Sequence, residues 1–403
     1  MPFQKAFIPY GGYWSTPFCR WQGSFAHLNA IPFAAEIATR ALQERGVSPK
    51  VFDLLLLGMT VPQKHSFYGG PWLAGLIGAE AITGPIISQA CATGARVLAT
   101  AAFEMESEED RTILTITCDR CSNGPHLYYP NPLGPGGTGN GEDWVWDNFS
   151  FDPFAKNAMI ETAENVTREA GITKEEQDEM TLLRYRQYDG ALKDDTAFLR
   201  RFMVIPIEVK DPSGRKVIAT VEGDEGVYPT TAEGLAKLKP VIGGGTVTYG
   251  TQTHPADANC GIIVTTRERA RELSRDPKVE VQLLSFGEGR AKKGYMAQAI
   301  IPATRQALSR AGITIEDVRV IKTHNPFAVN DIYFAREMGV KKEAMNNYGS
   351  SIVWGHPQGP TGSRLVIEVI EELVLVGGGY GLFVGCAAGD SAGAVVVKVT
   401  GEG

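Results

Sequence analysis

The sequence has little cysteine, no run of basic residues and no apolar stretch of membrane-spanning length. Six cysteines among 403 residues are too few for a disulfide scaffold, so we expect a reducing, cytoplasmic environment. A formal net charge of −7, without any Lys/Arg-rich run, argues against nucleic acid as a main partner. The apolar runs Leu54–Gly58 and Leu373–Val376 have the length of strands, so no membrane span is expected. The N-terminus lacks the charged and apolar regions of a signal peptide.

What the chain does contain is an internal repeat. Residues 93, 94 and 96 (Thr, Gly, Arg) recur 268 positions later as Thr361, Gly362 and Arg364, and the apolar strand 113–118 recurs at the same offset as 381–386. Residues 41–48 recur as 307–314. Self-similarity on this scale predicts two copies of one fold packed as a pseudo-symmetric pair. Alternating elements predict an α/β architecture with mainly parallel sheets and helices outside. The expected helices are 31–46, 92–105, 301–311 and 362–375, and the expected strands are 52–58, 85–89, 111–118, 259–266, 318–323, 380–386 and 391–398.

The first copy carries an insertion of 136 residues between Cys118 and Asn259, because its closing strand follows so much later than in the second copy. We therefore expect an N-terminal half of residues 1–118 plus 251–270, an inserted loop domain of 119–250 over the active site, and a C-terminal half of 271–403. A helix is expected over about 152–170, and Thr173 with Glu176 predicts a capping box that opens the next helix. The stretch 122–154 has the composition of a lid or binding loop, with aromatic residues Tyr128, Tyr129, Trp144, Trp146, Phe149, Phe151 and Phe154.

Cys91 lies between a β-branched strand and the start of a helix. A thiol at a helix N-terminus sits at the positive end of the dipole, which lowers its pKa and favours the thiolate. The small neighbours Ala90, Ala92 and Gly94 let a carbonyl substrate approach, and the Cys91 N–H is placed to stabilise an oxyanion. The alternative is an inert buried cysteine, which is equally common.

Four further residues join Cys91 if the two halves face each other. His356, framed by Gly355 and Pro357 before the second-copy helix, is expected to be the general base. Cys386 ends a strand and could act as an acid/base, although its repeat partner Cys118 favours a core role. His324 and Asn325 end another strand, where their donors could bind a thioester oxygen. Cys118 and Cys121 form a CxxC without a second pair, so no metal site is expected.

The combined motifs resemble the thiolase superfamily over nearly the whole chain. The family's N-terminal signature is similar to residues 16–23, its nucleophile motif to Ser88–Gly94, and its loop-domain signature to 159–165 and 172–178. Residues 235–240 and 245–248 resemble the stretch that precedes its coenzyme A contacts. The last two motifs match Gly355–Pro357 and Cys386–Gly389.

That resemblance implies an αβαβα sandwich of duplicated βαβαβ halves and a role for each matching residue. Cys91 is then the acylated nucleophile, His356 its base, and Cys386 the acid/base. His324 takes the position of the thioester oxyanion hole, with Asn325 beside it, and the N–H groups of Cys91 and Gly389 form a second hole. Coenzyme A is a co-substrate, with no permanent cofactor. Its expected contacts are Leu235, Tyr228, Thr248, Tyr249 and Gly250.

The sequence departs from the family at three places, and alternatives stay open. The usual Asn-Glu-Ala-Phe-like motif is His324-Asn-Pro-Phe327, an arginine is missing from residues 225–230, and residues 117–121 replace a Gly-Gly-Met-Glu-like stretch. The aromatic loop suggests a bulky or aromatic acyl group, as in a benzoylsuccinyl-CoA-type thiolase, unless its rings only pack the loop domain. The alternatives are a partner-dependent or non-catalytic subunit working with a small zinc-ribbon/OB-fold protein, and a ketosynthase-type condensing enzyme. A homo-oligomer, a dimer or dimer of dimers, is expected.

Overall fold

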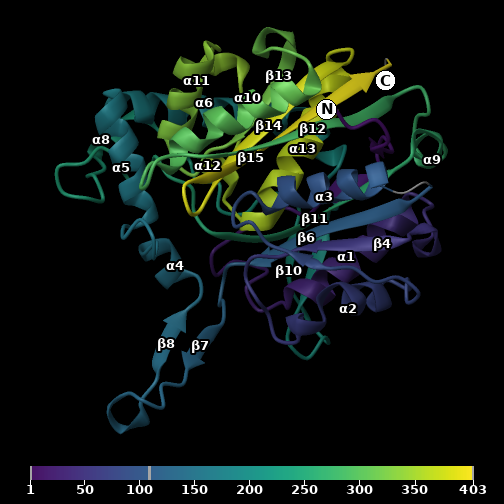
Figure 1. The fold of residues 1–403 in the computed structure, drawn as a ribbon, viewed down its shortest axis with the longest axis horizontal. Coiled ribbons are helices and arrows are strands. Elements are labelled where there is room, and N and C mark those ends of the chain that lie inside the picture. The colour runs from purple at the N-terminus through teal and green to yellow at the C-terminus, as the bar shows by residue number, and fades with distance from the viewer. Residues whose placement is uncertain (1, 108–109, 402–403) are drawn as a thin grey trace.

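A computed structural model describes residues 2–107 and 110–401 and has the expected five layers (Figure 1). Helices α3 and α13 form the middle layer between two half-sheets, α1 and α2 cover the outer face of the first, and α10 covers the second. The αβαβα arrangement of duplicated halves is thus confirmed. The first half contains α1 (Ala30–Glu44), β4 (Leu54–Gly58), α2 (Gly69–Leu76), β5 (Ile86–Ile87), α3 (Thr93–Ser107), β6 (Thr112–Arg120) and β11 (Ala256–Thr265). The second contains β12 (Glu280–Arg290), α10 (Ile300–Ala311), β13 (Val318–His324), α11 (Ala328–Met338), α12 (Ser351–Trp354), α13 (Gln358–Leu375), β14 (Gly379–Ala387) and β15 (Ser391–Thr400).

The two half-sheets are hydrogen-bonded into a single sheet. Its order is β13-β14-β15-β12-β1-β11-β6-β4-β5, in which β4 runs parallel to β5 and β6, and β13 runs parallel to β14. The N-terminal strand β1 (Phe7–Ile8) makes the join, because Phe7 pairs with Thr265 of β11 and with Gln282 of β12. Strands β2 (Tyr13–Ser15) and β3 (Cys19–Arg20) also pair with β11. The repeat predicts both half-sheets but contains nothing that predicts this connection.

The local sequence explains the helices that flank the sheet. In α1 the buried residues follow a spacing of three and four, which gives the helix one apolar face toward β6 and β11. The Asn29 side chain caps this helix by accepting the N–H of Ile31. Within the described ranges, no helix combines the length and apolarity needed to cross a membrane.

The middle layer depends on two glycines that are equivalent in the repeat. A Cβ atom on Gly94 of α3 would lie 2.5 Å from the Ser363 nitrogen and 2.8 Å from the Gly359 carbonyl oxygen of α13. A Cβ on Gly362 would lie 3.3 Å from the Gly94 Cα. The helix backbones therefore touch at the pseudo-symmetry axis, which brings the N-termini of α3 and α13 together.

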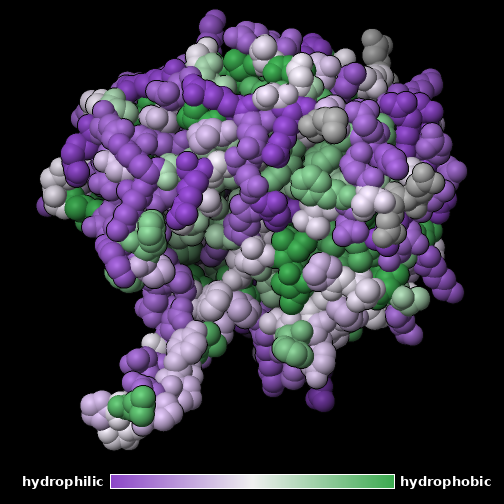
Figure 2. Space-filling view, in the orientation of Figure 1, coloured by the Kyte–Doolittle hydropathy of each residue, from purple (hydrophilic) through white to green (hydrophobic). Residues whose placement is uncertain are grey.

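The insertion between β6 and β11 divides into several parts. Its hairpin of β7 (His126–Tyr129) and β8 (Asn140–Asp143) projects from the body (Figures 1 and 2), with Tyr128, Tyr129 and Leu133 exposed. After the hairpin come four helices, α4 (Trp146–Ser150), α5 (Met159–Ala170), α6 (Lys174–Ala191) and α7 (Lys193–Arg200). They are followed by the strands β9 (Ile207–Lys210) and β10 (Val217–Val221) and by the helix α8 (Ala232–Lys237). Side chains of β9 and β10 join the core beneath α1, so the insertion also stabilises the first half.

One predicted boundary in this region is wrong, and one cap is confirmed. The helix expected from about residue 152 begins at Met159, because the Asp152 carboxylate accepts the N–H groups of Phe154 and Ala155 and closes a turn instead. The capping box of Thr173 and Glu176 is present at the start of α6.

We predict that Gly94→Ala lowers the free energy of unfolding by about 2–3 kcal/mol, because the added methyl meets backbone atoms that cannot move aside. The matched control is Gly75→Ala in α2, where no atom lies within 4 Å of the new Cβ. That substitution is expected to raise stability by about 0.5–1 kcal/mol. Denaturant unfolding of both variants measures the difference, and equal effects would contradict the close helix contact.

Candidate active site

Cys91 lies in the tight turn between β5 and α3. The turn is held by Thr93, whose hydroxyl donates to the Ala90 carbonyl at 2.7 Å and accepts the Gln89 N–H at 2.8 Å. Ala90 adopts a φ of 43°, a strained value for a residue with a side chain. This strained backbone at Ala90 fixes the direction of the Cys91 side chain. Cys91 is 5% exposed.

His356 enters from the second half, on the turn before α13. Gly355, at a φ of 94°, makes the turn, and the His356 N–H donates to the His254 carbonyl at 2.8 Å. The His356 Nδ1 lies 2.7 Å from the Thr361 Oγ1, and that hydroxyl donates to the Pro357 carbonyl. Because a hydroxyl has one proton, the Thr361 oxygen accepts from Nδ1–H. The Nε2 of His356 is thereby left with a free lone pair, as a general base requires.

His324 ends β13, beside Gly385 of β14 in the parallel pair. Its Nδ1 lies 2.8 Å from the Ser351 Oγ, which can also donate to the Asn325 Oδ1 at 3.0 Å. The direction of the Ser351 proton therefore sets the His324 tautomer. When Ser351 donates to Nδ1, the proton on Nε2 is available to a ligand oxygen. The alternative direction leaves Nε2 as an acceptor.

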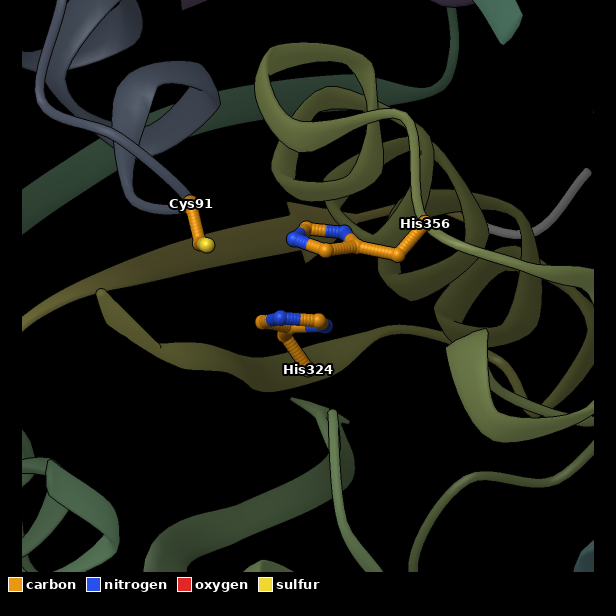
Figure 3. A group of neighbouring side chains, drawn as sticks. All are labelled: Cys91, His324 and His356. Atoms are coloured by element: carbon orange, nitrogen blue, oxygen red, sulfur yellow. The ribbon is translucent and has the colours of Figure 1, made fainter. Parts of the chain in front are cut away.

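The three side chains meet although they come from distant parts of the sequence (Figure 3). The Cys91 Sγ and a ring nitrogen of each histidine lie within 4.8 Å of one another. The imidazoles stack with ring centroids 3.9 Å apart, and both buried Nε2 atoms lack a hydrogen-bond partner. A thiol and two imidazoles are also ligand types that Zn²⁺ accepts. The sulfur and the two imidazoles are thus close enough to act on one reacting group.

Cys386 adjoins this cluster, at the end of β14 next to Gly385. It is buried, and its Sγ accepts the Asn330 Nδ2 at 3.2 Å. Burial raises the pKa of Cys386, and a charge on Cys91 adds to the rise. Ionisation of one sulfur therefore makes ionisation of the other less favourable.

Asn325 supports the site from behind instead of facing it. Its backbone N–H donates to the Ser351 Oγ at 3.2 Å, and its Nδ2 donates to Asp331 and Ser350. Asp331 is itself held by a buried ion pair with Arg184 at 2.7 Å. The donors of Asn325 are thus used within the protein, which differs from the sequence-based expectation of an oxyanion contact.

Burial governs the charge state of the cluster. It raises the pKa of Cys91 to about 12, although the N–H groups of Ala388 and of Cys91 itself favour the thiolate. It also lowers the pKa of His356 to about 3, and the pKa of His324 falls well below its usual value through burial and the neighbouring His356. The expectation of a lowered Cys91 pKa is therefore wrong, because burial outweighs the effect of the backbone N–H groups at the turn. The resting cluster is neutral, with the proton on sulfur.

Sequence reasoning missed Asp119, which joins the two halves at the site. Its carboxylate accepts the N–H groups of Thr60 and Val61 from the first half and of Gly359 from α13, at 2.7–2.9 Å. Burial raises the pKa of Asp119 to about 6, against these hydrogen bonds. Its flanking cysteines, residues 118 and 121, are free and buried. The aspartate lies inside the CxxC, whose two cysteines are the more conspicuous feature of this segment in the sequence.

Two cavities approach the cluster. The first, of about 450 Å³, reaches Ala90, Ala388 and Gly389 beside Cys91. Its outer wall comes from the aromatic part of the insertion, through Trp144, Phe149, Phe151 and Phe154. Gly389, which is expected to supply an oxyanion N–H, also lines this cavity, next to Ala388.

The second cavity, of about 360 Å³, contains part of the expected coenzyme A set. Tyr228, Tyr249 and Gly250 line it. Leu235 and Thr248 are buried behind Gly250: the Thr248 hydroxyl accepts the Gly250 N–H, and the Leu235 side chain fills the space that a Cβ on Gly250 would need. The lining also includes residues that sequence reasoning missed, namely Arg20, Trp21, Tyr185 and His254.

His254 could have been found from its sequence context. It precedes Pro255 just as His356 precedes Pro357, and the two segments pair through a bridge between Pro255 and His356. Gly355 provides the space for the His254 ring, since a Cβ there would lie 2.8 Å from the ring nitrogen Nε2.

Comparison with known proteins agrees with this geometry. The family model of the thiolase N-terminal domain matches residues 13–268, and the family model of the thiolase C-terminal domain matches residues 277–399. The chain is 28% identical over 390 residues to an acetyl-CoA acetyltransferase of Syntrophomonas wolfei, with 93% of each chain covered. It is 30% identical over 376 residues to the beta-ketothiolase BktB of Cupriavidus necator, covering 91% of this chain and 92% of the relative.

A solved structure shows the same fold. The human mitochondrial 3-ketoacyl-CoA thiolase in complex with CoA superposes with a TM-score of 0.89 and 25% identity, over 99% of each chain. Two family models together span nearly the whole sequence. The chain belongs to the thiolase family and is an acyltransferase.

We predict that alkylation of Cys91 by iodoacetamide accelerates about tenfold per pH unit between pH 7 and pH 9, because a thiol of pKa about 12 gains thiolate in that proportion. Mass spectrometry locates the label, and Cys91→Ser supplies the background from the other buried cysteines. A rate that is already flat above pH 7 would show a resting thiolate.

We also predict that Thr361→Val lowers kcat by about 10²-fold, at the lower end of a general base's contribution, because nothing then fixes the proton on the His356 Nδ1. Thr361→Ser keeps the hydroxyl and is expected to retain most of the activity. If valine and serine variants of equal thermal stability lose equal activity, the tautomer assignment fails.

Proposed function

We propose that the protein is a thiolase that cleaves a 3-oxoacyl-CoA with coenzyme A, or runs the reverse Claisen condensation, through an acyl-enzyme on Cys91. The observation that supports this most directly is that the Cys91 sulfur and a ring nitrogen of each histidine lie within 4.8 Å of one another, in a site where both Nε2 atoms lack a hydrogen-bond partner. A nucleophile beside a base of fixed tautomer is the arrangement that acyl transfer requires. The cavity beside Ala90 and Ala388 and the cavity beside His254 offer separate places for the acyl group and for coenzyme A.

In the first half-reaction the neutral pair reacts in a concerted way. The His356 Nε2 takes the thiol proton while the Cys91 sulfur attacks the C3 ketone, so no isolated charge forms in the buried site. The N–H groups of Cys91 and Gly389 stabilise the resulting oxyanion. The bond between C2 and C3 then breaks, and the electron pair moves into a thioester enolate. His324 and His356 hold the enolate oxygen, and Cys386 gives its proton to C2.

The second half-reaction reverses the roles. Cys386, now a thiolate, takes the proton of the incoming coenzyme A thiol, whose sulfur attacks the Cys91 thioester. The tetrahedral intermediate collapses, the acyl group leaves on coenzyme A, and the Cys91 sulfur recovers a proton from His356. The coupling between the two sulfurs suits this alternation, because each is uncharged when the other carries the charge.

We further propose that the acyl group is bulky and aromatic and that the reaction runs in the degradative direction. Four aromatic rings line the cavity beside Cys91, and flat apolar ligands gain most from such walls. A benzoylsuccinyl-CoA-type substrate is one member of this class. The nucleophile and both histidines come from this one chain, which favours catalysis without a zinc-ribbon/OB-fold subunit. A homo-oligomer in the cytoplasm remains part of the proposal.

We predict that the purified chain alone converts 3-oxo-3-phenylpropionyl-CoA and coenzyme A to benzoyl-CoA and acetyl-CoA. Its kcat/KM for this substrate is expected to exceed that for acetoacetyl-CoA by about tenfold or more, from the added apolar burial. Without coenzyme A, mass spectrometry should detect a benzoyl adduct on Cys91. Cys91→Ala is expected to lose about 10⁴-fold or more in turnover while unfolding at the same temperature as the unaltered chain.

The outcomes separate the parts of the proposal. Turnover by a folded Cys91→Ala protein would exclude the acyl-enzyme. A preference for acetoacetyl-CoA would remove the aromatic substrate but leave the thiolase chemistry. Activity that appears only on addition of a second protein would support the partner-dependent alternative.

A further inference from the structure

The aromatic cavity beside Cys91 also carries a buried polar group that catalysis does not use. Asp390 lies one residue beyond Gly389, lines the cavity and is 2% exposed. Its Oδ2 accepts the Gly294 N–H at 2.7 Å, whereas its Oδ1 is buried without a hydrogen-bond partner. A buried carboxylate oxygen left unpaired is costly, so this position calls for a donor.

The charged groups near Asp390 determine which ligands this wall of the cavity favours. Burial raises the pKa of Asp390, and the nearby Asp152, another lining residue, raises it further. The backbone N–H groups of Gly294 and Tyr295 and the Arg290 guanidinium offset this rise only in part. The guanidinium lies over the Phe154 ring and is not among the lining residues. The lining residues include no lysine or arginine. An anionic group placed at Asp390 would therefore meet two carboxylates of the lining, Asp152 and Asp390. Lys156, Arg290 and Lys293 lie over the Phe151 and Phe154 rings and are not among the lining residues.

A second unpartnered group lies in the same wall. Both the Nδ2 and the Oδ1 of Asn157 are buried without partners, although the residue lines the cavity. Asn157 is close to the Gly294 turn, since a Cβ on Gly294 would lie 3.4 Å from its Nδ2. The Gly294 turn thus lies close to both unpartnered groups, the carboxylate and the amide.

We infer that this cavity selects aromatic acyl groups bearing an uncharged hydrogen-bond donor, such as a phenolic hydroxyl, which Asp390 accepts, and that it rejects acyl groups bearing a carboxylate. This inference rests on the proposed thiolase function and adds the substrate class. The aromatic rings hold the flat body of the acyl group, and a hydroxyl on the ring completes the hydrogen bonding of the Asp390 Oδ1. A site built to bind a hydroxyl discriminates strongly against the analogue that lacks it.

The test compares 3-oxo-3-arylpropionyl-CoA substrates that differ only on the ring. We expect kcat/KM for the better of the 3- and 4-hydroxyphenyl compounds to exceed that of the phenyl compound by about tenfold or more. The 4-carboxyphenyl compound should fall at least about tenfold below phenyl. Asp390→Asn presents an amide to the cavity and is expected to reduce the hydroxyl preference by about tenfold. The control, Asp189→Asn on the exposed face of α6, should leave every ratio unchanged.

Each result decides a separate point. Equal kcat/KM for hydroxyphenyl and phenyl substrates, or a hydroxyl preference that survives in Asp390→Asn, would overturn the inference while thiolysis stands. A uniform loss for all substrates with a lower unfolding temperature would reduce Asp390 to a support of the Gly294 turn. If no substrate of any kind is cleaved, the proposed function fails. In that case, or if Asp390→Asn does not fold, calorimetry on the unaltered chain decides: tighter binding of a hydroxybenzoyl-CoA than of benzoyl-CoA supports the inference, and equal binding overturns it.

Discussion

The contact between Gly94 and Gly362 is the constraint on which the rest of the molecule depends. Because neither residue has a side chain, α3 and α13 meet backbone to backbone at the pseudo-symmetry axis. The turn that carries Cys91 precedes one helix, and the turn that carries His356 precedes the other. Asp119 then links the loop after β4, in the first half, to the first turn of α13 by accepting an N–H group from each. The cluster of Cys91, His324 and His356 is a product of the duplication, because the cysteine comes from one half and both histidines come from the other.

Desolvation decides how those groups react. The burial that raises the pKa of Cys91 to about 12 also lowers the pKa of His356 to about 3, so a permanent ion pair is disfavoured. The hydroxyls of Thr361 and Ser351 become important for this reason. They direct neutral imidazoles, where a charged imidazolium would have donors on both nitrogens. The hydroxyls thus prepare the site by fixing which imidazole nitrogen carries the proton, without a standing charge on sulfur or imidazole.

Much of this was accessible from the sequence, and the remainder depends on three-dimensional proximity. The 268-residue offset predicts the duplicated halves, and motif spacing predicts that Cys91 and His356 meet. The pKa of Cys91 could not be predicted, because helix position is local whereas burial depends on both halves. Asn325 was expected at the substrate, and its partners Ser351 and Asp331 come from other elements. Asp390 was missed because a single aspartate after a glycine resembles any turn residue.

The N-terminal strand has a consequence for how the chain is made. β1 leaves the ribosome before both of its partners, β11 and β12, which lie beyond residue 255. It therefore waits, unpaired, until β11 has been synthesised. At about 5–20 residues per second this wait lasts on the order of 10–50 seconds. Its late insertion closes the last gap in the sheet, so the union of the two halves is a long-range step in folding. An edge as short as two residues exposes little backbone during that wait, which limits misassociation.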